Sequence, residues 1–229
     1  MKATAAGAEI DGQTVRQRAR RARRLLPRGF YERPTLDVAR DLLGMVLVHN
    51  RRGVRTSGVI VEVEAYIGES DPACHAAPGL TKRNAPLYGA PGHAYVYLNY
   101  GIHCLVNVVT ESHGSPAAVL IRALDPLDGI AVMRRRRARA MKGRRRSASA
   151  IATHHLCRGP GNLTMAMGIT LADNRLDLTG ERLFVEDRGI ALDEVVWGPR
   201  IGIRVGTETP WRAWVAGHPA VSATQKGLS

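Results

Sequence analysis

Apolar and polar residues alternate between positions 59 and 66 of the chain. Side chains of a β-strand point alternately to its two faces, so this alternation predicts a strand. The small aliphatic residues share one predicted face, namely Val59, Val61, Val63 and Ala65. The opposite face carries Glu62, Glu64 and Tyr66. Two carboxylates and a phenol are therefore expected to project together.

A second alternating segment occupies residues 94–100. Tyr95, Tyr97 and Asn99 fall on one side of this predicted strand, with aliphatic residues between them on the other. Gly101 accepts the positive φ of a tight turn, so Tyr100 and Gly101 are predicted at the tip of a hairpin. A returning strand is expected at residues 103–110.

The same reading predicts the remaining elements. Thr35 is placed to cap a short helix that ends at Gly44, a residue suited to a helix C-terminus. Residues 45–49 and 54–66 form a predicted hairpin, residues 71–93 a long loop, and residues 117–123 a strand. A turn at residues 125–129 leads into a helix from about residue 130, and closing strands are expected at 201–205, 212–215 and 220–222. The fold class is therefore predicted as α+β: a single domain around a curved, mostly antiparallel β-sheet, with flanking helices and a protruding β-hairpin.

Positive charge is concentrated in two segments of this 229-residue chain, whose net charge is +13. Residues 1–33 carry nine Lys and Arg against three acids, and residues 134–146 carry nine against none. The rest of the chain is thus close to neutral. Clustered arginine favours a polyanionic partner, and nucleic acid is the obvious one. The alternative is that 29 arginines against four lysines reflect coding bias, with both segments merely solvated.

These features predict the domain organisation. We expect a basic, disordered N-terminal arm at residues 1–28, with a basic helix at 15–26 that forms against a partner. One folded domain is expected at 29–223, with a basic, flexible insertion at 134–150 and a short tail at 224–229. No apolar segment approaches the ~20 residues that cross a bilayer, and no signal peptide is recognisable, so we expect a cytoplasmic, nucleoid-associated protein.

Cysteine and histidine give no sign of a metal site. Cys74, Cys104 and Cys157 are far apart in sequence, which fits free thiols in a reducing compartment. His154 and His155 are adjacent and so project differently, which disfavours a shared metal ligand set. We therefore expect neither a metal nor another cofactor.

Glu64 is the first candidate for chemistry. Tyr66 shares its predicted face, and His75 follows on a loop that can fold back over it. A carboxylate in such company suits general acid–base catalysis, although an exposed glutamate is often only solvated. Spacing alone leaves these two interpretations equally open.

A series of motifs resembles the alkyladenine (3-methyladenine) DNA glycosylase family, in order and at compatible spacing from about residue 29 to 222. The motifs are Val61–Gly68, His75, Arg83-Asn84, Tyr95–Gly101, Asn107, Val119–Leu127 and Gly159-Pro160-Gly161-x-Leu163. The resemblance implies an enzyme that flips a damaged purine out of double-stranded DNA and hydrolyses its N-glycosidic bond, leaving an abasic site for base excision repair.

The resemblance also implies roles for single residues. Glu64 corresponds to the general base that activates water, and Arg122 to a residue near that water. The flipped base would be held by Tyr66, His75 and Tyr97, while Tyr100 fills the vacated place in the stack.

The resemblance also implies roles for further residues, some of which have an alternative structural interpretation. Asn107 and Leu120 match the floor of the base pocket, where purines with a 2-amino group are disfavoured; Leu120 fits plain core packing equally well. Four residues lie where the family approaches the DNA backbone, the alternative being a solvated loop: Thr81, Lys82, Arg83 and Asn84.

Three departures from the family pattern and the scarcity of lysine limit what carries over. Asn162 stands where the family usually has lysine, and Ile102 stands where relatives often carry larger side chains. The segment 134–150 has no recognisable counterpart. A glycosylase that also cleaves the strand needs an amine nucleophile, and of the four lysines only Lys82 lies near the expected site. A monofunctional, water-dependent enzyme is therefore predicted, and we separately expect a monomer.

Two other functions stay open at this point. A non-catalytic nucleic-acid-binding protein with a vestigial pocket would bind DNA without releasing a base. A hydrolase acting on a small nucleoside would have no use for Tyr100 at a hairpin tip or for the basic segments.

Overall fold

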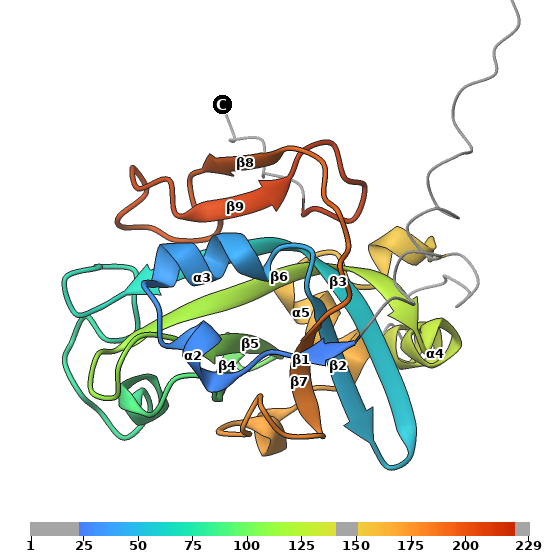
Figure 1. Ribbon diagram of the computed structural model, residues 1–229, viewed down its shortest axis with the longest axis horizontal. Helices are drawn as coiled ribbons and strands as arrows, with labels where there is room; N and C mark the ends of the chain where they lie inside the picture. Colours follow the sequence, from blue (N-terminus) through green and yellow to red (C-terminus); the bar gives the residue numbers. More distant parts are fainter. Residues whose placement is uncertain (1–22, 141–150, 223–229) are drawn as a thin grey trace, which may run out of the picture.

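Two long strands, β3 (Val54–Ile67) and β6 (Ala117–Asp128), pair antiparallel at the centre of the sheet (Figure 1). The computed structural model describes residues 23–140 and 151–222. Within these residues every strand pair is antiparallel, and the main sheet order is β1-β7-β2-β3-β6-β5-β4. This arrangement and the helices around it confirm the predicted α+β class.

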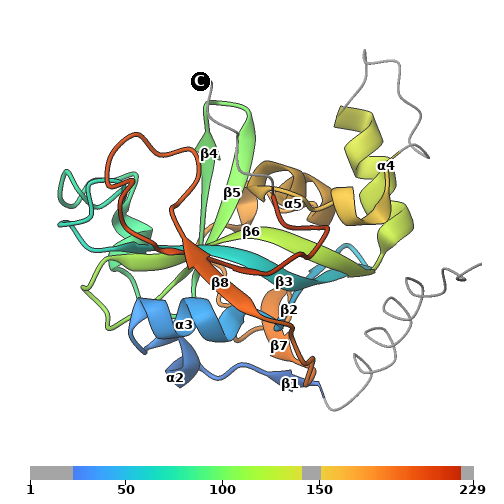
Figure 2. The same ribbon diagram turned by 90° about the horizontal axis from the view of Figure 1, so that it is seen from above.

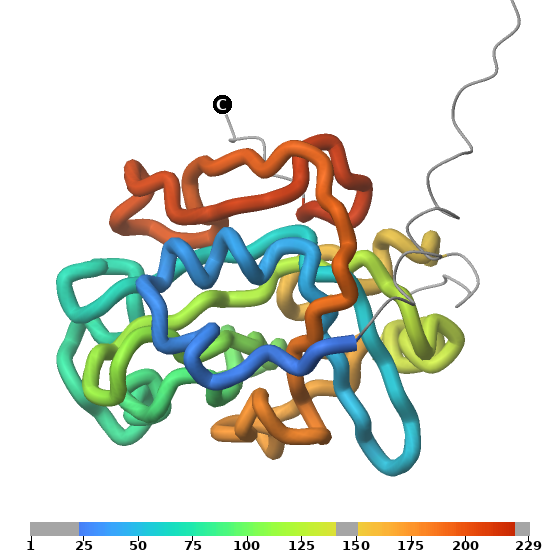
Figure 3. The backbone as a smooth tube through the Cα atoms, in the orientation of Figure 1, coloured from blue at the N-terminus to red at the C-terminus, as the bar shows by residue number. Residues whose placement is uncertain are grey.

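The remaining strands complete this sheet. Their bounds are β1 Arg24–Leu25, β2 Val46–Arg51, β4 Ala94–Asn99, β5 His103–Val109, β7 Leu183–Asp187, β8 Val195–Gly198 and β9 Arg212–Val215. One edge of β3 pairs first with β2 and then with β9, because β2 ends its pairing where β9 begins. Figure 3 follows the orange and red C-terminal part of the chain as it turns back beside β3.

Helices lie on both sides of the long strands. Their bounds are α2 Arg28–Tyr31, α3 Thr35–Leu42, α4 Ile130–Ala140 and α5 Pro160–Met167, with 3-10 turns at Ala85–Tyr88, Thr153–His155 and Leu171–Asp173. Figure 2 shows α2 and α3 on one side of β3 and β6, and α4 and α5 on the other. The hairpin β4–β5 projects from the domain on the side of α4 and α5, as predicted.

Two irregularities in the β3–β6 pairing decide where the central side chains point. Ile60 lies opposite Leu124, but Glu62 lies opposite Ala123 and the following pair skips a residue of β6. One residue of each strand, Val61 and Arg122, is therefore left without a partner, which is the signature of a β-bulge.

The bulges overturn one detail of the predicted alternation. Val59 and Val61 pack in a smaller apolar cluster, whereas Val63 and Ala65 belong to the main core. The expected single apolar face from 59 to 65 is therefore wrong, because each bulge inverts the alternation of the residues that follow it. Glu62 and Glu64 still lie close together, since both contact Arg122.

Several other boundaries differ from expectation. Thr35 is not the cap of α3 but its first residue, and its hydroxyl bonds Thr110 and Glu111 instead. Gly44 does follow the helix with φ +81°, as predicted. Residues 125–128 extend β6 rather than forming a turn, and residues 201–205 and 220–222 are not strands. Strands β1, β7 and β8 were not predicted.

The basic segments are in part folded. Leu26 is buried and Arg28 donates to Asp177 at 2.6 Å, so residues 23–28 join the domain. Residues 134–140 belong to α4 rather than to a flexible insertion, because Arg136 donates to backbone carbonyls of α5. The rest of the predicted arm, insertion and tail (residues 1–22, 141–150 and 223–229) lies outside the described residues.

Candidate active site

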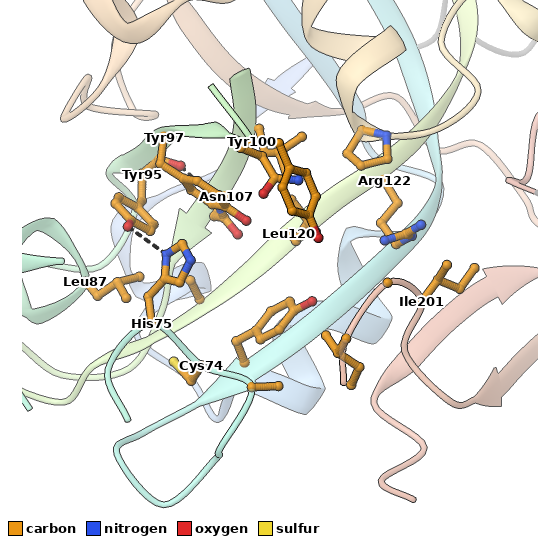
Figure 4. Close-up of a pocket in the computed structure, with 18 residues that line it drawn as sticks. Cys74, His75, Leu87, Tyr95, Tyr97, Tyr100, Asn107, Leu120, Arg122 and Ile201 are labelled. Atoms are coloured by element: carbon orange, nitrogen blue, oxygen red, sulfur yellow. Dashed lines mark hydrogen bonds between the residues drawn. The ribbon is translucent and has the colours of Figure 1, made fainter. Parts of the chain in front are cut away.

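A cavity of about 510 Å³ opens where the hairpin β4–β5, the loop after β3 and the first turn of α5 meet (Figure 4). Seven side chains singled out from the sequence line it together: Tyr66, His75, Tyr97, Tyr100, Asn107, Leu120 and Arg122. These residues come from β3, β4, β5, β6, the loop after β3 and the hairpin tip. The structure therefore brings the predicted pocket residues to one place.

Glu64 lies directly behind the wall of this cavity and is fully buried. Its Oε2 accepts hydrogen bonds from the Tyr66 hydroxyl at 2.9 Å and from Nη1 of Arg122 at 3.0 Å. Its Oε1 accepts the backbone N–H of Ile201 at 2.6 Å. All three donors line the cavity. Among the described residues Oε1 accepts one hydrogen bond and Oε2 accepts two, of the about four that a carboxylate can accept.

Aromatic rings form one side of the cavity. The rings of His75 and Tyr97 meet edge to face at 4.4 Å, and those of Tyr95 and Tyr97 lie 5.3 Å apart. A hydrogen bond of 2.9 Å joins His75 Nδ1 to the Tyr95 hydroxyl, drawn dashed in Figure 4. Burial, and next the charge of Arg83, lower the pKa of His75. His75 is thus a neutral ring at neutral pH and suits contact with a flat, electron-poor ligand.

Tyr66 is held from two directions. Its hydroxyl donates to Glu64, and the guanidinium of Arg200 lies 4.7 Å from its ring centroid. Burial, and next the Glu64 carboxylate, raise the pKa of Tyr66 well above its ordinary value. The phenol therefore stays protonated and remains a donor to Glu64.

Tyr100 stands at the hairpin tip, 80% exposed and with φ +49°. The turn has three residues, because Asn99 pairs with His103, so the expected two-residue turn is one residue too short. Ile102, the third residue of the turn, is also exposed. A non-glycine residue in the left-handed region is strained, and a large ring exposed there has no packing reason in this chain.

Asn107 and Leu120 lie side by side on β5 and β6 and form part of the floor. The amide of Asn107 is buried, and its Nδ2 donates to the Tyr95 carbonyl at 3.0 Å. Leu120 is buried and also lines the cavity, so the two interpretations of this residue hold together.

The segment 81–84 divides in two. Thr81, Lys82 and Arg83 are exposed, whereas Asn84 is buried and donates from Nδ2 to the carbonyls of His75 and Gly79. Asn84 therefore shapes the loop that carries His75, and only its three neighbours have exposed side chains.

Sequence reasoning missed three residues at or behind the cavity wall, namely Arg200, Ile201 and Arg212. Glu62 and Arg212 form a buried ion pair at 2.7 Å, Arg200 binds both oxygens of Asp71, and Ile201 supplies its N–H to Glu64. Arg200, Ile201 and Arg212 lie 129 or more residues from their acidic partners, and no local pattern links such positions.

Residues 23–140 and 151–222 contain no group of three or more His, Cys, Asp or Glu that could hold a metal ion. In the same part of the chain, no helix is both long enough and apolar enough to cross a membrane. The three cysteines are free.

Comparison with known proteins gives one consistent family. Residues 29–219 match the sequence model of the family described as "Methylpurine-DNA glycosylase (MPG)". Two relatives, each named "Putative 3-methyladenine DNA glycosylase", come from Methanocella arvoryzae and Rhodopseudomonas palustris. The first is 48% identical over 208 residues, covering 89% of this chain and 98% of the relative. The second is 47% identical over 197 residues, covering 86% and 90%. The chain therefore belongs to the methylpurine-DNA glycosylase family of DNA repair enzymes.

Proposed function

We propose that this protein flips alkylated or deaminated purines out of double-stranded DNA and hydrolyses their N-glycosidic bond with a water activated by Glu64. The observation that carries the proposal is the buried Glu64 carboxylate, which lies directly behind an aromatic cavity and is held by three donors that line it. A base placed in that cavity would have its deoxyribose near this carboxylate.

The reaction balances with these groups alone when the leaving purine is alkylated and positively charged; an uncharged deaminated purine leaves as its anion and takes a proton from solvent water. Water donates a proton to Glu64 while its oxygen bonds to C1′ of the sugar, and the electron pair of the C1′–N bond leaves with the purine, which departs neutral. The negative charge of Glu64 also stabilises the positive charge that develops on the sugar. The hydrogen bonds from Tyr66 and Arg122 fix the orientation of the carboxylate.

Base selection follows from the cavity walls. Tyr66, His75 and Tyr97 would sandwich a flipped purine, and their electron-rich faces attract a cationic alkylated base more than a normal one. Asn107 and Leu120 would meet the edge of the purine, where guanine carries its 2-amino group. Lesions with an empty 2-position are therefore favoured.

Double-stranded DNA is the proposed partner of a monomeric enzyme. Tyr100 at the projecting hairpin would enter the stack in place of the flipped nucleotide, and the exposed Thr81, Lys82 and Arg83 would approach the backbone. Helix α4 rises on the same side of the domain as the hairpin (Figure 2). Its exposed Arg139 would add a phosphate contact.

Hydrolysis without strand cleavage is expected, because a strand-cleaving glycosylase forms a Schiff base with an amine. Lys82 is the one lysine in the described part of the chain, and it is exposed rather than part of the cavity wall. The proposed enzyme needs no cofactor.

A base-release assay tests this function. The enzyme is incubated with duplexes that each carry 3-methyladenine, 7-methylguanine, hypoxanthine or ethenoadenine, and with the corresponding free nucleosides. We expect release from at least one damaged duplex, leaving an intact abasic strand, and little from nucleosides. Binding to every duplex with no release would favour a vestigial pocket, and faster release from nucleosides would favour a small-molecule hydrolase.

A further inference from the structure

Glu62, the second carboxylate of β3, is fully buried and lies outside the cavity wall. Its Oε1 accepts Nε of Arg122 at 2.9 Å, Nε of Arg212 at 2.7 Å and the Ser222 hydroxyl at 2.6 Å. Its Oε2 accepts the Ser222 backbone N–H at 2.7 Å. Four donors on one buried carboxylate are more than a structural ion pair requires.

The guanidinium of Arg122 joins the two carboxylates. Its Nε binds Glu62 and its Nη1 binds Glu64 at 3.0 Å. The bulge at Arg122 makes this possible, because the extra residue turns the side chain toward β3 between the two glutamates. Two buried carboxylates and two buried guanidiniums, those of Arg122 and Arg212, thus form a cluster of zero net charge.

Glu62 is ionised in this cluster. Burial alone would raise the pKa of its carboxyl, but the charge of Arg122, the hydrogen bonds from Ser222 and the charge of Arg212 outweigh it and lower the pKa. A buried carboxylate that keeps its charge acts on every neighbouring charge through a medium that screens poorly.

We propose that Glu62 is a positioning residue for the reaction: it holds Arg122 against Glu64 and, by balancing the second guanidinium, keeps Glu64 able to take a proton from water. This inference rests on the proposed role of Glu64 as general base. It assigns the cluster around Glu62 a catalytic purpose beyond stability.

The sign of the effect follows from the charges around Glu64. Two phenols near Glu64, those of Tyr66 and Tyr97, stay neutral. The charged groups near Glu64 besides Glu62 are the guanidiniums of Arg122, Arg200 and Arg212. The charge of Arg200 is balanced by Asp71. Loss of the Glu62 charge leaves a surplus positive charge beside Glu64. That charge stabilises the carboxylate form of Glu64 and so makes it a weaker base. Loss of the Arg212 charge has the opposite effect.

The test is the pH dependence of single-turnover base release by Glu62→Gln, Arg212→Gln and the double variant, on the damaged duplex that wild type cleaves best. We expect the acidic limb of the pH–rate profile to shift to lower pH by on the order of one unit in Glu62→Gln. In Arg212→Gln it should shift to higher pH by a similar amount. The double variant should return it close to the wild-type position. The plateau rate of Glu62→Gln should fall roughly tenfold.

Glu186→Gln is the matched control. Glu186 is also a buried glutamate of the sheet and is paired with Arg55 and Arg188, but it lies on β7 away from the cavity. Its substitution should lower stability without moving the profile. Because Glu62→Gln removes a buried charge, Arg212→Gln serves as an independent variant whose upward shift supports the proposal on its own.

The outcomes separate this inference from the proposed function. If the acidic limb is unshifted in Glu62→Gln and Arg212→Gln, as in the Glu186→Gln control, the proposed role of Glu62 is wrong. The proposed role of Glu64 as general base would not be affected by that result. Wild-type base release by a Glu64→Gln variant would instead remove the general base and the inference with it.

Discussion

Tyr100 gives a prediction in which stability and activity separate. The ring is 80% exposed, and full burial of a large side chain is worth about 2 to 3 kcal/mol, so Tyr100→Ala should lower the free energy of unfolding by only about 0.5 kcal/mol. The activity loss should be larger. An aromatic ring stacked on a base contributes about 1 to 3 kcal/mol, and the wedge would use it to offset unstacking.

These values predict a roughly tenfold slower single-turnover release from a stably paired lesion, such as hypoxanthine opposite cytosine. A lesion in a weaker pair, such as hypoxanthine opposite thymine, needs less free energy to flip, so its rate of release should fall by a smaller factor. Tyr100→Gly is the control, because glycine adopts φ +49° without strain but brings no ring. It should be as slow as the alanine variant. Equal losses on both pairs, or recovery in the glycine variant, would show that Tyr100 acts through the turn and not as a wedge.

Three further predictions concern selectivity, DNA contact and acid stability. Asn107→Ser should raise guanine release relative to hypoxanthine release by removing a bulky amide from the floor; an unchanged ratio in a competition assay would exclude that role. Arg139→Gln on α4 should weaken binding to damaged and undamaged duplexes alike and flatten the slope of log K against log salt by about one. Arg24→Gln, on β1 at the other side of the domain, should leave binding and slope unchanged. If Arg139→Gln has the same slope as wild type, α4 lies away from DNA. Burial alone would raise the pKa of Asp173, but the His49 ring, whose Nε2 lies 3.6 Å from Oδ1, and next the backbone N–H of Thr170 lower it to about 2. Its stabilisation is complete above about pH 4 and is lost as the pH falls toward 2, a loss of about 2 kcal/mol that denaturant titrations of Asp173→Asn should no longer show.

Alternation and turn residues predicted the parts of the fold that depend on neighbouring positions. The hairpin β4–β5, the β2–β3 hairpin and the tyrosine face of β4 are all in this class. Two bulges were not predictable, because the aliphatic residues of β3 continue through Val61 without a break and an extra residue appears only when β6 is laid beside it. Residues 201–205 are not a strand, and the Ile201 N–H donates to the Glu64 side chain and not to a neighbouring strand.

The site was predictable where one short segment carries it. Glu64 and Tyr66 are two residues apart, so a strand pattern alone puts them together. Arg122 and Ile201, which also donate to the carboxylate, lie far along the chain, so no local pattern predicts them; Arg122 was expected there only through the family resemblance, and Ile201 was not expected. The arginines of α4 were misread in another way, because a run of basic residues suggested a flexible segment. Arg134 and Arg136 instead donate hydrogen bonds to backbone carbonyls, and these bonds hold the helix against the domain.

The most direct measurement of the central claim compares wild type with Glu64→Gln, which keeps the shape of the side chain and removes the base. Single-turnover release from a damaged duplex and the affinity for the same duplex are measured together. We expect release to fall by roughly 10²-fold or more while affinity stays within a few-fold, because the amide can still occupy the space between Tyr66, Arg122 and Ile201. Near-wild-type release by the glutamine variant would contradict the account and remove Glu64 from the mechanism.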